Sequence, residues 1–142
     1  MKRIAVMFII LSLLLFFACK HENIEELEAD HMATVEFVEE GSFFDDFTIK
    51  DNQVELWCNI CVNNKTKNQQ IIRIQGDFFE DWKSGLLKER IIDAQAPLSG
   101  ETQFVIPPGE SHIHLVFCGT YGEGDIQKQN RLLPQIIISQ IT

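Results

Sequence analysis

Basic residues are scarce in this sequence, and cysteine, proline and tyrosine are scarcer still. Its 142 residues include 12 Lys and Arg against 21 Asp and Glu, which gives a formal net charge of −9 at pH 7. Nucleic acids are bound by clustered Lys and Arg, so we expect no nucleic-acid partner. Four prolines and eight glycines are too few for a collagen-like or low-complexity chain. With 45% hydrophobic residues, the composition indicates one ordinary globular domain.

Only one long hydrophobic run is present, and it lies at the N-terminus. Residues 4–17 follow Lys2 and Arg3 and contain a single polar residue, Ser12. A helix over this run reaches about 21 Å, whereas a bilayer's hydrocarbon core is roughly 30 Å thick. A charged start, a short apolar run and a small residue are typical of a signal peptide. We therefore expect residues 1–18 to be removed, with an uncleaved anchor helix as the alternative.

The end of this run resembles the lipobox of bacterial lipoprotein precursors. The resemblance is carried by Phe16, Phe17, Ala18 and Cys19. In that family the cysteine after the cleavage site receives diacylglycerol, which implies lipidation of Cys19. Two or three acyl chains give a stable anchor. The resemblance therefore implies an extracytoplasmic protein that is attached by lipid to a bacterial membrane and whose partner is an envelope protein.

The segment that follows is acidic and has few large apolar side chains. Residues 20–33 read KHENIEELEADHMA. Repulsion between like charges keeps such a segment extended. We expect residues 19–33 to be a lipidated cysteine and an acidic tether, and residues 34–142 to be one β-sandwich domain.

Beyond residue 34 the dominant pattern is alternation of apolar and polar residues. In residues 54–62 every second residue is apolar, which predicts a strand with one buried face. Seven further segments are rich in strand-forming residues: 35–38, 43–49, 70–79, 85–92, 103–106, 112–118 and 135–141. Eight strands at hairpin spacing predict an all-β fold, an antiparallel two-layer sandwich.

Two alternatives remain open at this point. A small closed barrel has the same strand pattern and differs only in closure. Residues 83–94 also fit one short helix, because Leu86, Leu87, Arg90 and Ile91 recur at helical spacing.

The order of turns and strands over residues 53–117 resembles the immunoglobulin-like modules of bacterial surface lipoproteins. The resemblance is carried by an Asn-rich turn at residues 63–68, a strand ending at residues 76–79, a turn at 84–86, and residues 106–110 leading into a Phe-containing strand. It implies an immunoglobulin-like sandwich. It leaves function open, since this fold serves many roles.

A second local resemblance concerns Trp57-Cys58-Asn59-Ile60-Cys61, which is similar to the Trp-Cys-x-x-Cys motif of thioredoxin-like oxidoreductases. In that family the first cysteine begins a helix whose dipole stabilises the thiolate. Here the alternation continues through both cysteines. We therefore expect a strand and no catalysis, with a thiol-disulfide oxidoreductase as the alternative.

Three cysteines remain after Cys19, which allows one disulfide and one free thiol. Strand alternation places Cys61 and Cys118 on the same outward face and favours that pair. The alternative pair, Cys58 with Cys118, is similar in its separation to the inter-sheet disulfide of immunoglobulin domains. The absence of a bridge also stays open.

The same outward face carries His112 and His114, which with Cys61 and Cys118 offer ligands for tetrahedral Zn²⁺. A metal-binding lipoprotein is therefore a further alternative. No Gly-rich phosphate loop opens a helix, so we expect no cofactor.

Two pairs of adjacent aromatic residues are candidate surface contacts. In Phe43-Phe44 and in Phe78-Phe79 one ring must leave the buried face. Our leading hypothesis is a lipid-anchored, non-enzymatic binding or accessory module of the bacterial cell envelope.

Overall fold

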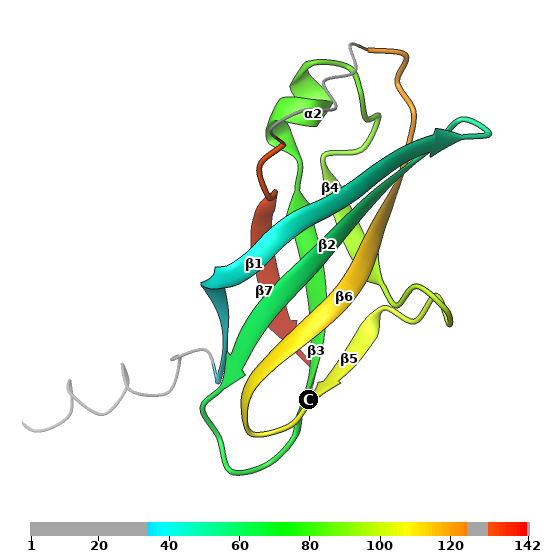
Figure 1. The fold of residues 1–142 in the computed structure, drawn as a ribbon. Helices are drawn as coiled ribbons and strands as arrows, with labels where there is room; N and C mark the ends of the chain where they lie inside the picture. Colours follow the sequence, from blue (N-terminus) through cyan, green and yellow to red (C-terminus); the bar gives the residue numbers. More distant parts are fainter. Residues whose placement is uncertain (1–33, 125–130, 142) are drawn as a thin grey trace, which may run out of the picture. The chain divides into compact units, whose positions relative to one another are not determined.

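A computed structural model describes residues 34–124 and 131–141, so the predicted signal peptide, Cys19 and the tether lie outside the described residues. The described part has antiparallel strand pairing and is all-β, as predicted, and it also contains one short helix (Figure 1). Its elements are β1 (Val35–Lys50), β2 (Gln53–Asn64), β3 (Gln70–Asp77), α2 (Phe79–Lys83), β4 (Ile91–Gln95), β5 (Gln103–Ile106), β6 (Gly109–Thr120) and β7 (Gln135–Gln140). Among these residues no helix is both long and apolar enough to cross a membrane.

Strand β2 forms where the alternation is strongest. Its inward residues, Val54, Leu56, Cys58, Ile60 and Val62, are all fully buried. It pairs with β1 on one side and with β6 on the other. The prediction of a half-buried strand at residues 54–62 is confirmed.

The segments 35–38 and 43–49 were predicted as two strands, but they belong to the single strand β1. The register against β2 shifts between Val38 and Phe43, and again between Phe44 and Asp46. Gly41 lies in the first irregularity with φ of +83°, a conformation that glycine adopts without steric cost. The strand therefore continues through a bulge at the point where the two predicted segments were separate.

The strands form one hydrogen-bonded sheet in the order β1-β2-β6-β4-β3-β5, with β7 paired to β3. Strand β4 connects two groups, because Ile91–Asp93 pair with β3 while Ala94 and Gln95 pair with β6. Figure 1 shows β1, β2 and β6 in front of β3, β5 and β7. The sheet is open, so the closed-barrel alternative is wrong for the described strands.

One hydrophobic core collects the inward side chains of β2, β3 and β6. At its centre the rings of Phe78 and Phe117 meet edge to face with centroids 5.1 Å apart. Gly76 lies beneath them, and a Cβ built there would stand 2.6 Å from the Phe78 ring. The absence of a side chain at Gly76 is what lets this pair of rings pack against β3.

The segment after β3 differs from both predictions made for it. Residues 79–83 form α2, and β4 begins only at Ile91, so the predicted strand at 85–92 is wrong over most of its length. The alternative helix at 83–94 is also wrong. Gly85 has φ of +78° and follows the last turn of α2, which ends the helix there. Leu86 and Leu87 are buried, but they are held by N–H bonds to the Asp81 carbonyl in a turn.

Candidate functional site

The outward face of β2 and β6 carries most of the chemistry-bearing residues singled out above. In the antiparallel register Cys61 lies opposite His112, and Asn63 lies opposite Glu110. Glu110 and His112 are two residues apart on β6, so their side chains share this face. The pairing of the two strands therefore brings Cys61, Glu110 and His112 together.

These three residues form a compact cluster, which we call the Cys61 cluster. One potential ligand atom from each residue lies within 4.8 Å of those of the other two. His112 Nε2 is 3.6 Å from Glu110 Oε1. Burial, together with a hydrogen bond to the Glu110 carboxylate and its negative charge, raises the pKa of the Cys61 thiol. The thiol is therefore protonated at neutral pH and donates to Glu110.

The bulge of β1 covers the thiol side of the cluster. The Ser42 hydroxyl donates to the Val38 carbonyl over 2.6 Å and accepts the Cys61 backbone N–H over 2.8 Å. A Cβ on Gly41 would stand 3.1 Å from Cε1 of the His112 ring. Cys61 is consequently fully buried although it points away from the hydrophobic core, whereas Glu110 and His112 are exposed.

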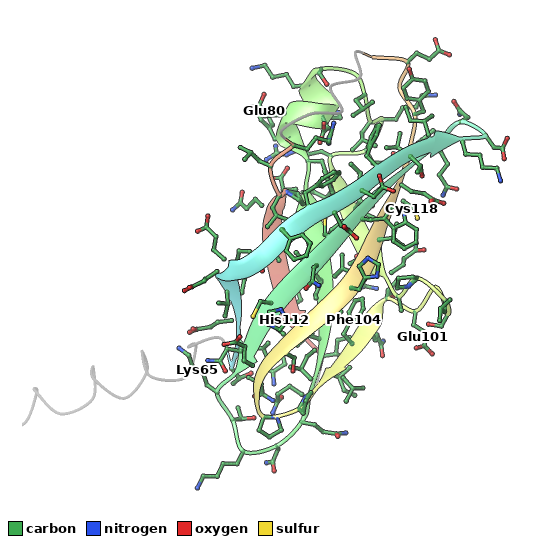
Figure 2. All side chains as sticks on the ribbon, viewed as in Figure 1. Lys65, Glu80, Glu101, Phe104, His112 and Cys118 are labelled. Carbon is green, nitrogen blue, oxygen red and sulfur yellow. The ribbon has the colours of Figure 1, made fainter. Side chains whose placement is uncertain are left out.

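His114 and Cys118 do not join this cluster. The His114 Nε2 atom lies 3.3 Å from Asp45 Oδ2, and its ring is 5.6 Å from that of Trp57. Cys118 lies opposite Glu55, toward the other end of β6 from His112 (Figure 2). Of the four residues offered as metal ligands in the sequence alternative, Cys61 and His112 lie in the cluster, whereas His114 and Cys118 lie elsewhere on β6. Glu110 was not among the four.

Neither predicted disulfide is formed, since Cys58, Cys61 and Cys118 are free thiols. Cys61 lies opposite His112, six residues from Cys118 along β6, which is roughly 20 Å of strand. Cys58 lies opposite Leu115, three residues from Cys118, which is about 10 Å. Disulfides need Cα atoms within about 7 Å. The outward placement of Cys61 was predicted correctly. Alternation, however, does not give the distance along the strands between Cys61 and Cys118.

Cys58 has the opposite surroundings from a redox-active thiol. It lies in the middle of β2, it is fully buried in the core, and no helix begins there. Burial, with a smaller effect from the Asp45 charge, raises the pKa of Cys58 to about 12. A nucleophilic cysteine needs a lowered pKa and access to solvent. The Trp-Cys-x-x-Cys spacing is thus embedded in a strand whose two cysteines face opposite sides.

The two aromatic pairs each place one ring inward and one outward. Phe78 is buried and Phe44 packs against the core. Phe43 and Phe79 are 51% and 40% exposed. The Phe43 ring lies on the face of β1, and Phe79 lies at the start of α2.

Phe79 belongs to a larger exposed group at the α2 end of the domain, which Glu80 marks in Figure 2. Its ring centroid is 6.2 Å from that of Trp82, which is 46% exposed. Arg90 lies over the Phe79 ring at 5.0 Å and Lys83 at 5.7 Å. We call Phe79, Trp82 and these two cations the aromatic patch.

Asp77 fixes Arg90 in this arrangement. Its two carboxylate oxygens accept bonds of 2.8 and 2.7 Å from the guanidinium, a bidentate geometry that suits arginine. This hydrogen bonding lowers the pKa of Asp77. The guanidinium of Arg90 is therefore held over the Phe79 ring.

Sequence reasoning missed Glu110 and Trp82. Glu110 was placed only in the segment 106–110 that leads into a strand, although its i, i+2 spacing from His112 was a usable signal. Trp82 follows Phe79 by three residues, which is helical spacing, but the α2 helix was not anticipated. Comparisons with protein-family models, curated proteins and solved structures gave no match to this chain.

Proposed function

We propose that this protein is a lipid-anchored, non-enzymatic binding module of the bacterial cell envelope, and that its domain is an immunoglobulin-like sandwich. The lipobox-like sequence ending at Cys19 supports the anchor. The two parts of the proposal are separate: the N-terminal sequence carries the location, and the aromatic patch carries the binding role.

The arrangement of the core supports the sandwich. Inward residues of β2 and β6 share one hydrophobic cluster with inward residues of β3, and they include Leu56, Ile60, Leu115, Phe117, Ile72 and Ile74. Side chains from two strand groups that fill a common core are typical of face-to-face packing. Strand β4 pairs with both groups. A strand that passes from one layer to the other accounts for this double pairing.

The single observation that carries the binding role is the exposure of the aromatic patch. Aromatic residues and arginine are enriched at the energetic centres of protein–protein interfaces. Here Phe79 and Trp82 are exposed, and the bidentate bond to Asp77 orients Arg90 over Phe79. A surface that is ordered in advance loses less side-chain entropy on association. The proposed occupant is another protein of the cell envelope.

The thiol-disulfide alternative finds no support in the geometry. The Cys58 thiol is fully buried with a pKa raised to about 12 by desolvation, and the strand gives it no helix dipole. Catalysis by this pair would require β2 to leave the core.

Lipidation is tested by metabolic labelling of the full chain with radioactive palmitate in a bacterial host. We expect label in the wild type and in Cys118→Ser, which changes a different thiol, and loss of label in Cys19→Ala. The Cys19→Ala protein is also expected in the soluble fraction. Label that persists in Cys19→Ala would refute the anchor.

Binding is tested by site-specific photocrosslinking in intact cells. A photoreactive amino acid in place of Trp82 is expected to form a discrete crosslinked product with a protein partner. The matched control carries it in place of Leu98, another large apolar residue, which is fully exposed in the loop between β4 and β5. Products that are equal at both positions, or absent at position 82, would contradict the proposal.

A further inference from the structure

We propose that the Cys61 cluster is a binding site for one Zn²⁺ ion, with Cys61, Glu110 and His112 as its three protein ligands. This inference does not depend on the binding role of the aromatic patch, because the two surfaces share no residue. It replaces the metal set expected from the sequence.

The chemistry of the three side chains fits zinc. Zn²⁺ is bound by thiolate sulfur at about 2.3 Å, by imidazole nitrogen at about 2.0–2.1 Å and by carboxylate oxygen at about 2.0–2.2 Å. One ligand of each kind is present here. Hard cations such as Ca²⁺ and Mg²⁺ prefer sites built from oxygen alone, so a thiol and an imidazole disfavour them.

The distances fit as well. Ligand atoms around a tetrahedral ion at these bond lengths lie roughly 3.3–3.7 Å from one another. His112 Nε2 and Glu110 Oε1 are already 3.6 Å apart. All three candidate atoms lie within 4.8 Å of one another. Closing the remaining gap needs only side-chain rotation by Glu110 and His112, whose side chains are more than half exposed.

The backbone that carries the ligands is fixed by strand pairing. Cys61 and His112 are direct partners in the β2–β6 ladder, and Glu110 is two residues from His112 on the same face. Sites built on paired strands hold their geometry better than sites on loops. The Ser42 hydroxyl anchors the backbone of Cys61 from the β1 side.

The burial of the ligands is graded in a way that suits an ion entering from solvent. Cys61 is buried beneath the β1 bulge, while Glu110 and His112 are exposed to solvent. The bulge allows close approach at Gly41, where any side chain would meet the His112 ring. Three protein ligands leave the fourth tetrahedral position for a water molecule.

Binding replaces one proton and involves no redox change. The Cys61 thiol loses its proton to solvent, and a sulfur lone pair forms the bond to zinc. A Glu110 carboxylate oxygen and a His112 ring nitrogen supply the other two protein ligands.

The experiment uses the full-length protein, purified in detergent under reducing conditions and titrated with Co²⁺ and then Zn²⁺. A thiolate bound to Co²⁺ gives a charge-transfer absorption in the near ultraviolet. We expect this band to grow to saturation at one Co²⁺ per chain and to disappear on addition of Zn²⁺. Failure of the band to appear would refute the site.

Matched variants assign the ligands. Cys61→Ser is expected to abolish the band, and His112→Gln and Glu110→Gln are each expected to weaken Zn²⁺ binding by about tenfold or more. Cys118→Ser and His114→Gln are the controls, because they change the same residue types on the same face outside the cluster.

The inference is overturned if the band survives in Cys61→Ser, if it is lost in Cys118→Ser, or if His112→Gln binds no more weakly than His114→Gln. His112 and Glu110 are exposed, so their variants are expected to fold. They therefore keep the test decisive even if the Cys61→Ser protein does not fold. Failure of the crosslinking experiment at Trp82 would leave this result unaffected.

Discussion

Replacing Asn64 by aspartate tests how one buried amide secures the end of β2. Asn64 is 2% exposed. Its side-chain nitrogen donates to the carbonyls of Asn68 over 2.8 Å and of Ile106 over 3.0 Å. Its side-chain oxygen accepts the N–H of Thr66 over 2.9 Å and the Thr66 hydroxyl over 2.8 Å. The residue thus ties the β2–β3 turn to the end of β5.

Asn64→Asp keeps the shape and the bond from the Thr66 N–H but removes both donors. Each lost hydrogen bond contributes about 1 kcal/mol, and a buried carbonyl left without its donor costs about a further 1–3 kcal/mol. The Thr66 hydroxyl has one proton and lies 2.8 Å from the Asn68 carbonyl as well as from the side chain at position 64. When it donates to Asn68, the further cost falls on Ile106 alone. We expect the free energy of unfolding to drop by about 3–5 kcal/mol at pH 7, against a typical total of about 5–15 kcal/mol.

The sign of the pH dependence follows from the same contacts. A buried carboxylate that faces two carbonyl oxygens has a pKa above its unfolded value of about 3.9. The penalty is therefore small below that pH and grows as the pH rises and the folded-state carboxyl is forced to ionise. The deficit of Asn64→Asp relative to wild type is expected to be smaller at pH 4 than at pH 7.

Urea denaturation at both pH values measures the effect. With a slope of about 1–3 kcal/mol per molar urea, the midpoint at pH 7 should fall by about 1 M or more. Asn68→Asp is the matched control, because it adds the same charge to the same turn at an exposed side chain. Equal midpoints for the two variants, or a deficit that does not change with pH, would refute the reasoning.

Three further predictions concern packing, thiol access and acid stability. Gly76→Ala should lower the free energy of unfolding, measured in urea, by about 1–3 kcal/mol, because the added Cβ meets the Phe78 ring. Adding Phe78→Leu should recover part of this loss, and the absence of any recovery would contradict the steric explanation. Maleimide should label the partly exposed Cys118 in the folded protein and label Cys58 only after unfolding, as read by mass spectrometry; equal rates would show that the core opens. Burial acts to raise the pKa of Glu89, but hydrogen bonds from Thr120 outweigh it and lower the pKa. Glu89→Gln should therefore reduce the free energy of unfolding at pH 7, and this loss should vanish as the pH falls below about 4. A loss of stability that persists in acid would contradict the direction of the pKa shift.

The strand pattern was predictable where one face of a strand meets the core. Alternation located β2 and placed Cys58 inward and Cys61 outward, because side chains on a strand point to opposite faces by geometry. It did not reveal that Cys61 is buried as well. That burial comes from the bulge in β1, for which Gly41 inside a strand pattern was the available signal.

The register between β2 and β6 was beyond the reach of local patterns. Which residue lies opposite Cys61 depends on how strands about fifty residues apart align, and that alignment is decided by packing of the whole core. The sequence therefore placed Cys61 and His112 on one face but did not show that Glu110 joins them and that His114 and Cys118 do not. The α2 helix escaped for a related reason, since five residues are too few to show a helical period.

The two irregularities of β1 have a consequence for contact between copies of this domain. This strand of 16 residues stands at the end of the strand order, where a straight run of free backbone groups would template addition of a neighbouring molecule. Register shifts break it into short lengths. Where the proposed lipid anchor concentrates these molecules on a membrane, the interrupted edge of β1 offers them no continuous run of backbone groups along which fibrils could grow.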